Sequence, residues 1–267
     1  FIVKDKDYAL KFNNSTIYED VISVTPSTIN SSGVFVYDSH YEQLNAYNRY
    51  DAVNNLLEAA DRKNTSGFIR EPNTGNVWAK VVNSTYSNVA YSSFEHGPGT
   101  TSAFTNWNYS IANIISTSYQ NGTRGFNLTG SSPITPVAAL SSSQKYKISL
   151  WRKIGGSNLT LIAGSTTLTP RLGPQRNGWQ YIEATFTGAT SVQVSGSYII
   201  DELRLYPQNA RMTSYVYKDG VGPISQCDEN NQNTFWEYDE FNRLKLTRDQ
   251  DGNIIIKNEY KYQHIQN

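Results

Sequence analysis

The sequence predicts an all-β protein in which a jelly-roll β-sandwich is flanked by β-hairpin repeats. Three observations lead to this fold class. Phrases that combine tyrosine with aspartate recur near the C-terminus, short alternating segments fill the middle of the chain, and tyrosine is abundant at 19 residues while charged residues make up only 17%. Tyrosine favours strands, whereas Asn, Gly and Ser favour the turns between strands.

Length and charge narrow the class of protein. A chain of 267 residues has room for one large or two modest domains. Because 23 basic residues balance 23 acidic ones, no electrostatic attraction to nucleic acid is expected. No apolar run approaches the roughly 20 residues that span a bilayer, so no membrane span is expected. The chain starts with Phe1 rather than methionine, which predicts that it is part of a longer protein.

Residues 1–90 are expected to form irregular strands with repeat character. Tyr50-Asp51 opens a phrase like those near the C-terminus, with Asn55 at the position of the turn glycine. A helix is the alternative, because the apolar residues after Asp51 also fit one helical face. The turn residues at 63–67 and the alternation of residues 77–82 favour strand, turn and strand.

Residues 91–207 are expected to form the sandwich, because short strands with Gly, Pro and Asn between them are typical of two-sheet β folds. Tyr146, Ile148 and Leu150 alternate and share one face. Pro207 is expected to close the last strand. The predicted strands are residues 125–128, 146–152, 179–186, 191–195 and 199–206.

Residues 208–267 return to the repeat. Tyr217, Tyr238 and Tyr260 follow one another at intervals of 21 and 22 residues, which indicates a repeat architecture. Asp-Gly is a strong hairpin signal, and Asn231 and Asn242, which stand in place of glycines, also tolerate the left-handed conformation. The order of repeat, sandwich and repeat predicts that the sandwich is inserted in a loop of a β-repeat array.

The repeat resembles the Rhs/YD-repeat family. The residues that carry the resemblance are Tyr238-Asp239, Arg243-Leu244, Asp251-Gly252-Asn253 and Tyr260-Lys261-Tyr262. Residues 45–267 look like the C-terminal portion of such proteins in Bacteroidota-type bacteria. The resemblance implies a secreted or cell-surface protein, exported by the type IX route, with components of the secretion translocon as partners.

The middle segment resembles carbohydrate-binding jelly rolls of the galactose-binding-like kind. The resemblance is carried by Ser93-Phe94-Glu95, Asn106-Trp107, residues 178–183 and residues 200–205. It implies that Glu95 and Asp201 hold a structural Ca²⁺ together with backbone carbonyls, since calcium takes six to eight oxygen ligands. The alternative is that both carboxylates are solvated or paired with arginine.

Three aromatic residues are candidates for binding a surface glycan. Trp107 and Tyr109 lie in a polar phrase that suggests an exposed rim, and Trp151 is expected on the face opposite Leu150. An exposed ring can pack against the C–H face of a sugar. The alternative is that they belong to the core, which is the expectation for Trp179.

The sequence offers little for catalysis, and we expect no enzyme. Its three histidines, His40, His96 and His264, are far apart, and Cys227 is the only cysteine. Asp201 and Glu202 are neighbours on a predicted strand, so their side chains should point to opposite faces and make a poor pair for glycoside hydrolysis.

The predicted function is therefore structural and adhesive, at the cell surface or in a secreted protein. One alternative is that the segment from residue 208 is an export signal recognised by the translocon. Another is that the repeats form part of an Rhs toxin shell.

Overall fold

The computed structural model describes residues 3–10, 25–32, 35–38, 41–95 and 101–261. Within these ranges the chain consists of β-strands with three short 3₁₀ helices and no α-helix, so the predicted all-β class is confirmed. The 3₁₀ helices are η1 (Tyr86–Asn88), η2 (Ser102–Thr105) and η3 (Ile111–Asn113). No helix in the described part of the chain is long and apolar enough to cross a bilayer.

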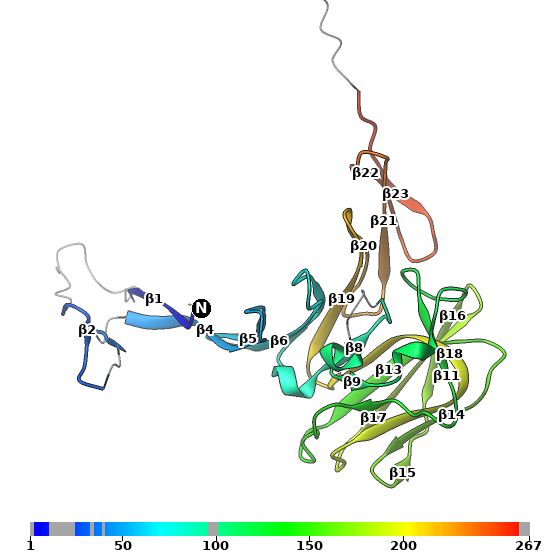
Figure 1. Ribbon diagram of the computed structural model, residues 1–267, viewed down its shortest axis with the longest axis horizontal. Helices are drawn as coiled ribbons and strands as arrows, with labels where there is room; N and C mark the ends of the chain where they lie inside the picture. The colour runs from blue at the N-terminus through cyan, green and yellow to red at the C-terminus, as the bar shows by residue number, and fades with distance from the viewer. Residues whose placement is uncertain (1–2, 11–24, 33–34, 39–40, 96–100, 262–267) are drawn as a thin grey trace, which may run out of the picture.

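One long antiparallel sheet runs through the molecule and extends beyond the compact part as two arms (Figure 1). We call it the array. Its strands in spatial order are β1 (Lys6–Leu10), β4 (Tyr41–Tyr50), β5 (Leu56–Asp61), β6 (Thr65–Arg70), β7 (Val77–Val82), β19 (Arg211–Lys218), β20 (Gly222–Cys227), β21 (Asn233–Tyr238), β22 (Leu244–Arg248) and β23 (Ile254–Lys257).

The array remains continuous across the largest gap in its sequence. β7 and β19 are hydrogen-bonded neighbours, with Met212 opposite Val81 and Ser214 opposite Ala79. The described residues between them, 83–95 and 101–210, contain the nine-stranded second sheet of the molecule.

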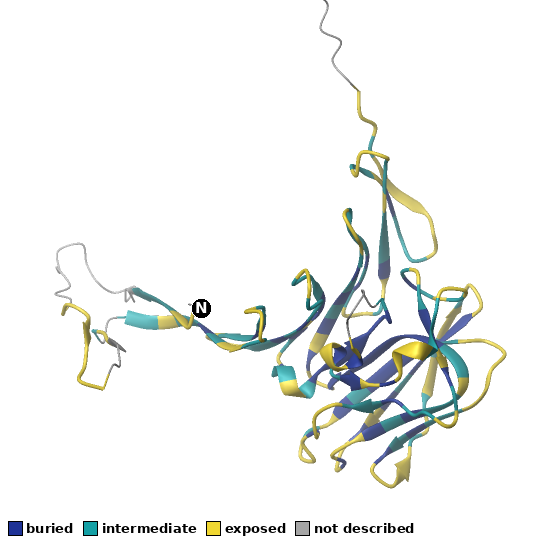
Figure 2. Cartoon of the chain, viewed as in Figure 1, coloured by how far each residue is buried: buried dark blue, intermediate teal, exposed yellow. Residues whose placement is uncertain are grey.

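This second unit is a β-sandwich, which contains most of the buried residues (Figure 2). Its strands are β8 (Ala90–Ser92), β10 (Ile114–Ile115), β11 (Gly125–Leu128), β13 (Tyr146–Lys153), β14 (Ser157–Ala163), β15 (Thr166–Thr167), β16 (Arg171–Arg176), β17 (Trp179–Phe186) and β18 (Val192–Pro207). Two short pairs complete the topology: β9 (Trp107–Asn108) with β12 (Thr135–Pro136), and β2 (Thr28–Ile29) with β3 (Phe35–Val36).

The long strand β18 connects the two layers of the sandwich. Its first half pairs with β14, and its second half pairs with β11 and β13. The change of layer follows Gly196, which has a φ of +138°, and a Cβ there would lie 2.6 Å from the carbonyl oxygen of Asn158. The sequence predicted two separate strands here, because the glycine bend interrupts the pattern of alternation.

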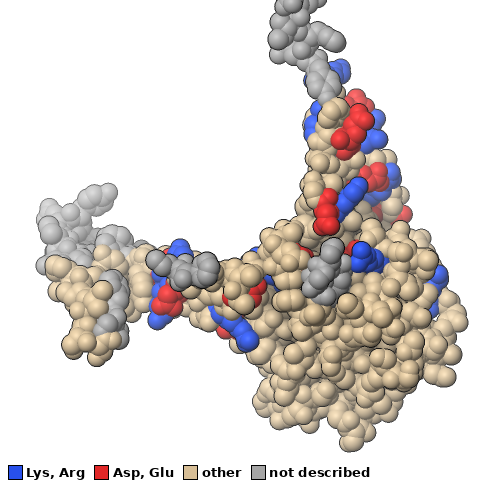
Figure 3. Space-filling view, viewed as in Figure 1, with Lys and Arg blue, Asp and Glu red and all other residues tan. Residues whose placement is uncertain are grey.

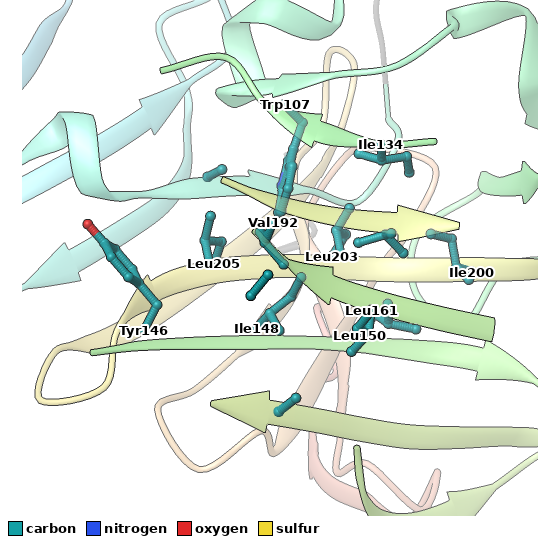
Figure 4. Close-up of a cluster of buried hydrophobic side chains, with 14 of the residues drawn as sticks. Trp107, Ile134, Tyr146, Ile148, Leu150, Leu161, Val192, Ile200, Leu203 and Leu205 are labelled. Atoms are coloured by element: carbon teal, nitrogen blue, oxygen red, sulfur yellow. The ribbon is translucent and has the colours of Figure 1, made fainter. Parts of the chain in front are cut away.

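The core between the layers is built from alternating apolar residues. Tyr146, Ile148 and Leu150 are fully buried in it, as their spacing predicted. Figure 4 shows them facing Leu161 and Val192 from the opposite layer. Burial of such side chains contributes about 1.5–3 kcal/mol each, which makes this cluster the main source of stability in the unit.

Four turns of the array share one geometry. Each starts with an aspartate whose Oδ1 accepts hydrogen bonds from the N–H groups two and four residues later, and the fourth residue of each is left-handed. The turns start at Asp51, Asp228, Asp239 and Asp249, and the left-handed residues are Asn54, Asn231, Asn242 and Gly252. Strand, turn and strand is therefore confirmed after Tyr50, but the left-handed position belongs to Asn54 and not to Asn55.

The tyrosine period corresponds to one hairpin of the array. The hydroxyl of Tyr238 donates to the carbonyl oxygen of Pro223 at 2.7 Å, and that of Tyr260 to the carbonyl oxygen of Leu244 at 2.8 Å. Each tyrosine thus reaches back to the backbone of a preceding strand, which ties neighbouring hairpins together.

Candidate functional site

Two of the predicted sugar-binding residues, Trp107 and Tyr109, belong to the sandwich core. Trp107 is fully buried and points into the cluster that contains Val192 (Figure 4). Tyr109 is 7% exposed and packs its ring against Phe94 and Phe126, with centroid distances of 5.3 and 5.2 Å. The expectation of an exposed rim was therefore wrong.

The polar neighbours of Trp107 explain this error. The side-chain amide of Asn106 donates to the carbonyl oxygens of Tyr86 and Val89, at 3.2 and 2.8 Å. Asn106 also takes the left-handed position that ends η2. The polar side chain of Asn106 therefore satisfies backbone carbonyl groups, and it does not indicate that Trp107 is exposed.

Trp151 lies on the predicted face of β13, opposite the core, but it is only 2% exposed. Together with Trp179 and Tyr181 it forms a separate aromatic cluster. Turns of the C-terminal hairpins cover this cluster: the Asn231 side chain donates to the Tyr181 hydroxyl at 3.0 Å. Trp151 is therefore not a surface residue, and the prediction of an exposed ring was wrong. Alternation along a strand indicates which face a side chain lies on but not what packs against that face.

A second covering turn, the one that starts at Asp249, contacts the sandwich through an ion pair and a hydrogen bond. The guanidinium of Arg176 in β16 lies 3.7 Å from the Asp251 carboxylate and also donates to the Gln250 side chain. A cavity of about 140 Å³ lies beside Trp151. Turns of the array thus pack on the outer face of the sandwich.

The two predicted calcium ligands, Glu95 and Asp201, bind the same loop. Both oxygens of Glu95 accept hydrogen bonds from Thr123, through its N–H at 2.5 Å and its hydroxyl at 2.7 Å. Asp201 Oδ2 accepts from the N–H groups of Gln120 and Asn121, at 2.8 and 2.9 Å. The two carboxylates therefore hold the two ends of the loop at residues 120–124.

Burial affects both of these carboxyl groups. It raises the pKa of Glu95, and it raises the pKa of Asp201 well above the ordinary value, with the charge of Glu202 as the next cause. A nearby cation would offset this cost, and the side-chain oxygen of Gln120 is buried without a hydrogen-bond partner among the described residues. However, no group of three or more acidic, histidine or cysteine side chains gathers around a metal position in that part of the chain.

Asp201 and Glu202 do not point to opposite faces, contrary to the expectation. Ser149 faces Arg204 and Trp151 faces Asp201, so two residues of β18 stand opposite one residue of β13. Glu202 has a φ of +54° at this β-bulge. The bulge turns both buried carboxylates towards Asn121, whose side-chain amide donates to Glu202 Oε1 at 3.2 Å.

Glu202 is the centre of a buried polar network. Its Oε2 lies 3.0 Å from Nη2 of Arg204, and the side chains of both are almost fully buried. Its Oε1 accepts from the Tyr91 hydroxyl at 2.9 Å. Arg204 also donates to Ser214 in β19 at 2.6 Å and to Asn231 in the turn after β20 at 3.0 Å. The network therefore joins the sandwich to the array.

A pocket of about 550 Å³ lies where the array meets the sandwich, and we call it the junction pocket. It combines two aromatic rings with charged and amide side chains. The array contributes Glu71, Asn73, Thr74, Asn76, Trp78, Tyr217, Lys218, Asp219 and Ile224, and the sandwich contributes Glu95, Thr123 and Arg124.

Sequence reasoning selected only Glu95 from this set. The other residues come from turns and strand ends on either side of the insertion, and nothing in the sequence shows that these positions meet. The one sequence feature that could have suggested this site is the presence of an aromatic residue near each end of the insertion, Trp78 and Tyr217. His40, His96 and His264 lie outside the described residues. Burial raises the pKa of the Cys227 thiol to about 11.

No protein-family model matches the chain, and no curated protein matches it. Among solved structures, the chain is similar to the CBM22-1 xylan-binding domain from Paenibacillus barcinonensis Xyn10C, at 13% identity. The match covers 44% of this chain and 92% of that domain, with a TM-score of 0.29. Function is therefore inferred from this chain's own residues.

Proposed function

We propose that this chain is a non-catalytic structural and adhesive segment of an exported YD-repeat protein. The array acts as the scaffold, and the sandwich is the module that the scaffold displays to surface glycans. The observation that carries this proposal is the direct pairing of β7 with β19, while the described residues of the intervening segment, 83–95 and 101–210, contain the sandwich. Such an arrangement holds a module firmly while leaving the scaffold continuous.

The repeated turns support the scaffold role. Each of the four turns starts with an aspartate and has its left-handed residue at the fourth position. A repeat architecture requires this uniformity, because each hairpin must present the same edge to the next. Single-layer arms, as in Figure 1, bury little apolar surface, and in Figure 3 charged side chains gather along them. These features suit an extended supporting element better than a catalytic one.

Binding of the full chain to an array of immobilised glycans, with calcium present, tests the adhesive role. We expect binding to at least one class of glycan. A folded chain that binds no glycan at all overturns the adhesive role.

The proposal includes a structural calcium ion beside Glu95 and Asp201. It is supported by the convergence of both carboxylates on one loop and by the buried side-chain oxygen of Gln120. An ion that binds only the folded state raises the unfolding midpoint. The midpoint should therefore fall when EDTA is added and recover with calcium, and an unchanged midpoint removes the ion from the proposal.

The proposal also places the chain outside the cell or on its surface, exported by the type IX route, as its likeness to YD-repeat proteins implies. Protease treatment of intact cells that produce an epitope-tagged full-length protein tests the location. We expect the tag to be digested without lysis, and full protection of the tag contradicts a surface location.

A further inference from the structure

We propose that the junction pocket is the glycan-binding site and that it takes a neutral oligosaccharide. This inference rests on the proposed adhesive function. The junction pocket takes the place of Trp107, Tyr109 and Trp151 as the candidate glycan-binding site, because those three residues are buried. A pocket of about 550 Å³ is within the range of ligand sites, which is about 300–1,000 Å³.

One partly exposed aromatic ring gives the pocket an apolar surface, and a second ring in its lining is almost fully buried. Trp78 on β7 belongs to a buried apolar cluster, and Tyr217 on β19 packs against that cluster while remaining partly exposed. A ring beside hydroxyl and amide groups matches a sugar, which has an apolar C–H face and a polar rim.

The turn between β6 and β7 supplies amide and carboxylate groups in a fixed position. Glu71 Oε2 accepts from the N–H of Thr74 at 2.5 Å, and the N–H of Gly75 donates to the carbonyl oxygen of Glu71 at 2.9 Å. Arg70 holds the turn through a bond of 2.7 Å to the carbonyl oxygen of Gly75. Asn73 and Asn76, which line the pocket, are therefore carried by a rigid turn.

The charges around the pocket favour a neutral ligand. Among the described residues of the lining, Glu71, Glu95 and Asp219 bring three carboxylates, whereas Arg124 and Lys218 bring two cations. Their formal charge is −1, or +1 with the proposed calcium ion beside Glu95, so it stays close to zero in either case. A sulfated or uronic-acid-rich chain would have to approach carboxylates on both sides of the pocket. Sugar hydroxyls, in contrast, can donate to carboxylates and accept from the two cations.

Both units are needed to form the site, and the loop at residues 120–124 brings them together. A Cβ at Gly122 would lie 2.3 Å from Glu95 Oε1 and 2.9 Å from Cγ1 of Val216, so this loop touches the sandwich on one side and the array on the other. Thr123 and Arg124, which follow Gly122, line the pocket. The pocket is therefore a joint product of the scaffold and the inserted module.

The test compares the full chain with variants of the pocket, using the neutral glycan that binds best on the array as the probe in isothermal calorimetry. Tyr217→Leu and Asn76→Ala should each weaken binding at least about tenfold, which corresponds to about 1.4 kcal/mol. Tyr260→Leu and Asp251→Asn, two exposed positions of the C-terminal hairpins, are matched controls and should bind like the wild type. Circular dichroism melts establish that every variant is folded.

The outcomes separate the site from the function. If a neutral glycan binds and both folded pocket variants keep wild-type affinity, the pocket is not the site, although the adhesive function stands. If sulfated glycans bind and neutral ones do not, the assignment of a neutral ligand is wrong. If the folded wild type binds no glycan, the adhesive function fails and the pocket assignment fails with it.

Discussion

The Ser225 hydroxyl donates a hydrogen bond of 2.6 Å to Oδ1 of Asn121, although 104 residues separate them. Ser225 belongs to β20 of the array and Asn121 to a loop of the sandwich, and both are buried. Through its amide, Asn121 also binds Glu202. A chain of buried polar contacts thus crosses from one unit to the other, and because buried polar groups are costly to separate from their partners, it holds the two units in one orientation.

Removing the charge of Glu202 should destabilise the protein strongly. Glu202→Gln leaves the Arg204 guanidinium buried without its counter-charge, and breaking a buried pair in this way costs about 3–5 kcal/mol. Urea denaturation measures the loss in the free energy of unfolding. The control is Glu229→Gln, which breaks the exposed pair with Arg211 and should cost about 0–1 kcal/mol. Equal effects of the two variants would contradict the central role of the network.

Gly122 should not tolerate a side chain. Gly122→Ala places a methyl group against Glu95 and Val216 at a φ of +72°, so strain of about 1–3 kcal/mol is expected. Gly130→Ala is the matched control, because nothing lies within 4 Å of the added Cβ. The unfolding midpoints of the two variants, measured by circular dichroism, should differ clearly, and an unchanged midpoint for Gly122→Ala would show that the loop moves aside.

The left-handed position of the array turns can be tested at Asn54, which is exposed and has a φ of 68°. Asn54→Ala should cost about 1 kcal/mol, because a Cβ is unfavourable in this conformation unless a short polar side chain compensates. Asn54→Gly should keep or raise the stability. The two free energies of unfolding, compared by urea denaturation, would be equal only if the turn adopted another conformation.

The turn aspartate Asp239 should make the C-terminal arm of the array sensitive to acid. The hydrogen bond from Arg243 lowers the pKa of Asp239 below its ordinary value, with the backbone N–H groups of the turn helping. A lowered folded-state pKa means that the contribution is fully present above the unfolded pKa of about 3.9 and is lost as the pH falls through the folded value.

Asp239→Asn, which cannot ionise, provides the comparison. Its unfolding midpoint should lie below that of the wild type at pH 7, and the difference should shrink as the pH is lowered from about 5 to about 2. Thermal melts across this range measure it. A difference that stays constant with pH would mean that the carboxylate charge at position 239 contributes nothing to stability.

Much of the local structure could be predicted from the sequence. The expected strands at 125–128 and 179–186 coincide with β11 and β17, and the alternation from Tyr146 to Leu150 placed the right residues in the core. The use of Asn in place of glycine at positions 231 and 242 was also predicted, and both have a φ of 59°. These features depend on neighbours within a few residues, so the local pattern is sufficient.

The candidate site depends on contacts that sequence patterns do not contain. Trp151 was placed on the correct face of its strand, but the hairpin turns that cover it come from residues about 80–100 positions away in the chain. The bulge at Glu202 follows from how β18 pairs with β13, and it brings together two carboxylates that simple alternation separates.

Side-chain alternation and local backbone preferences are sufficient to predict many of the strands, the hairpin turns and the apolar face of the strand from Tyr146 to Leu150. Which aromatic rings are covered, where β18 bulges and that Trp78, Tyr217 and Arg124 line one pocket depend on the tertiary structure. The physical reason is that burial and electrostatic environment are set by whatever packs on a surface, and here the packing partners come from distant parts of the chain.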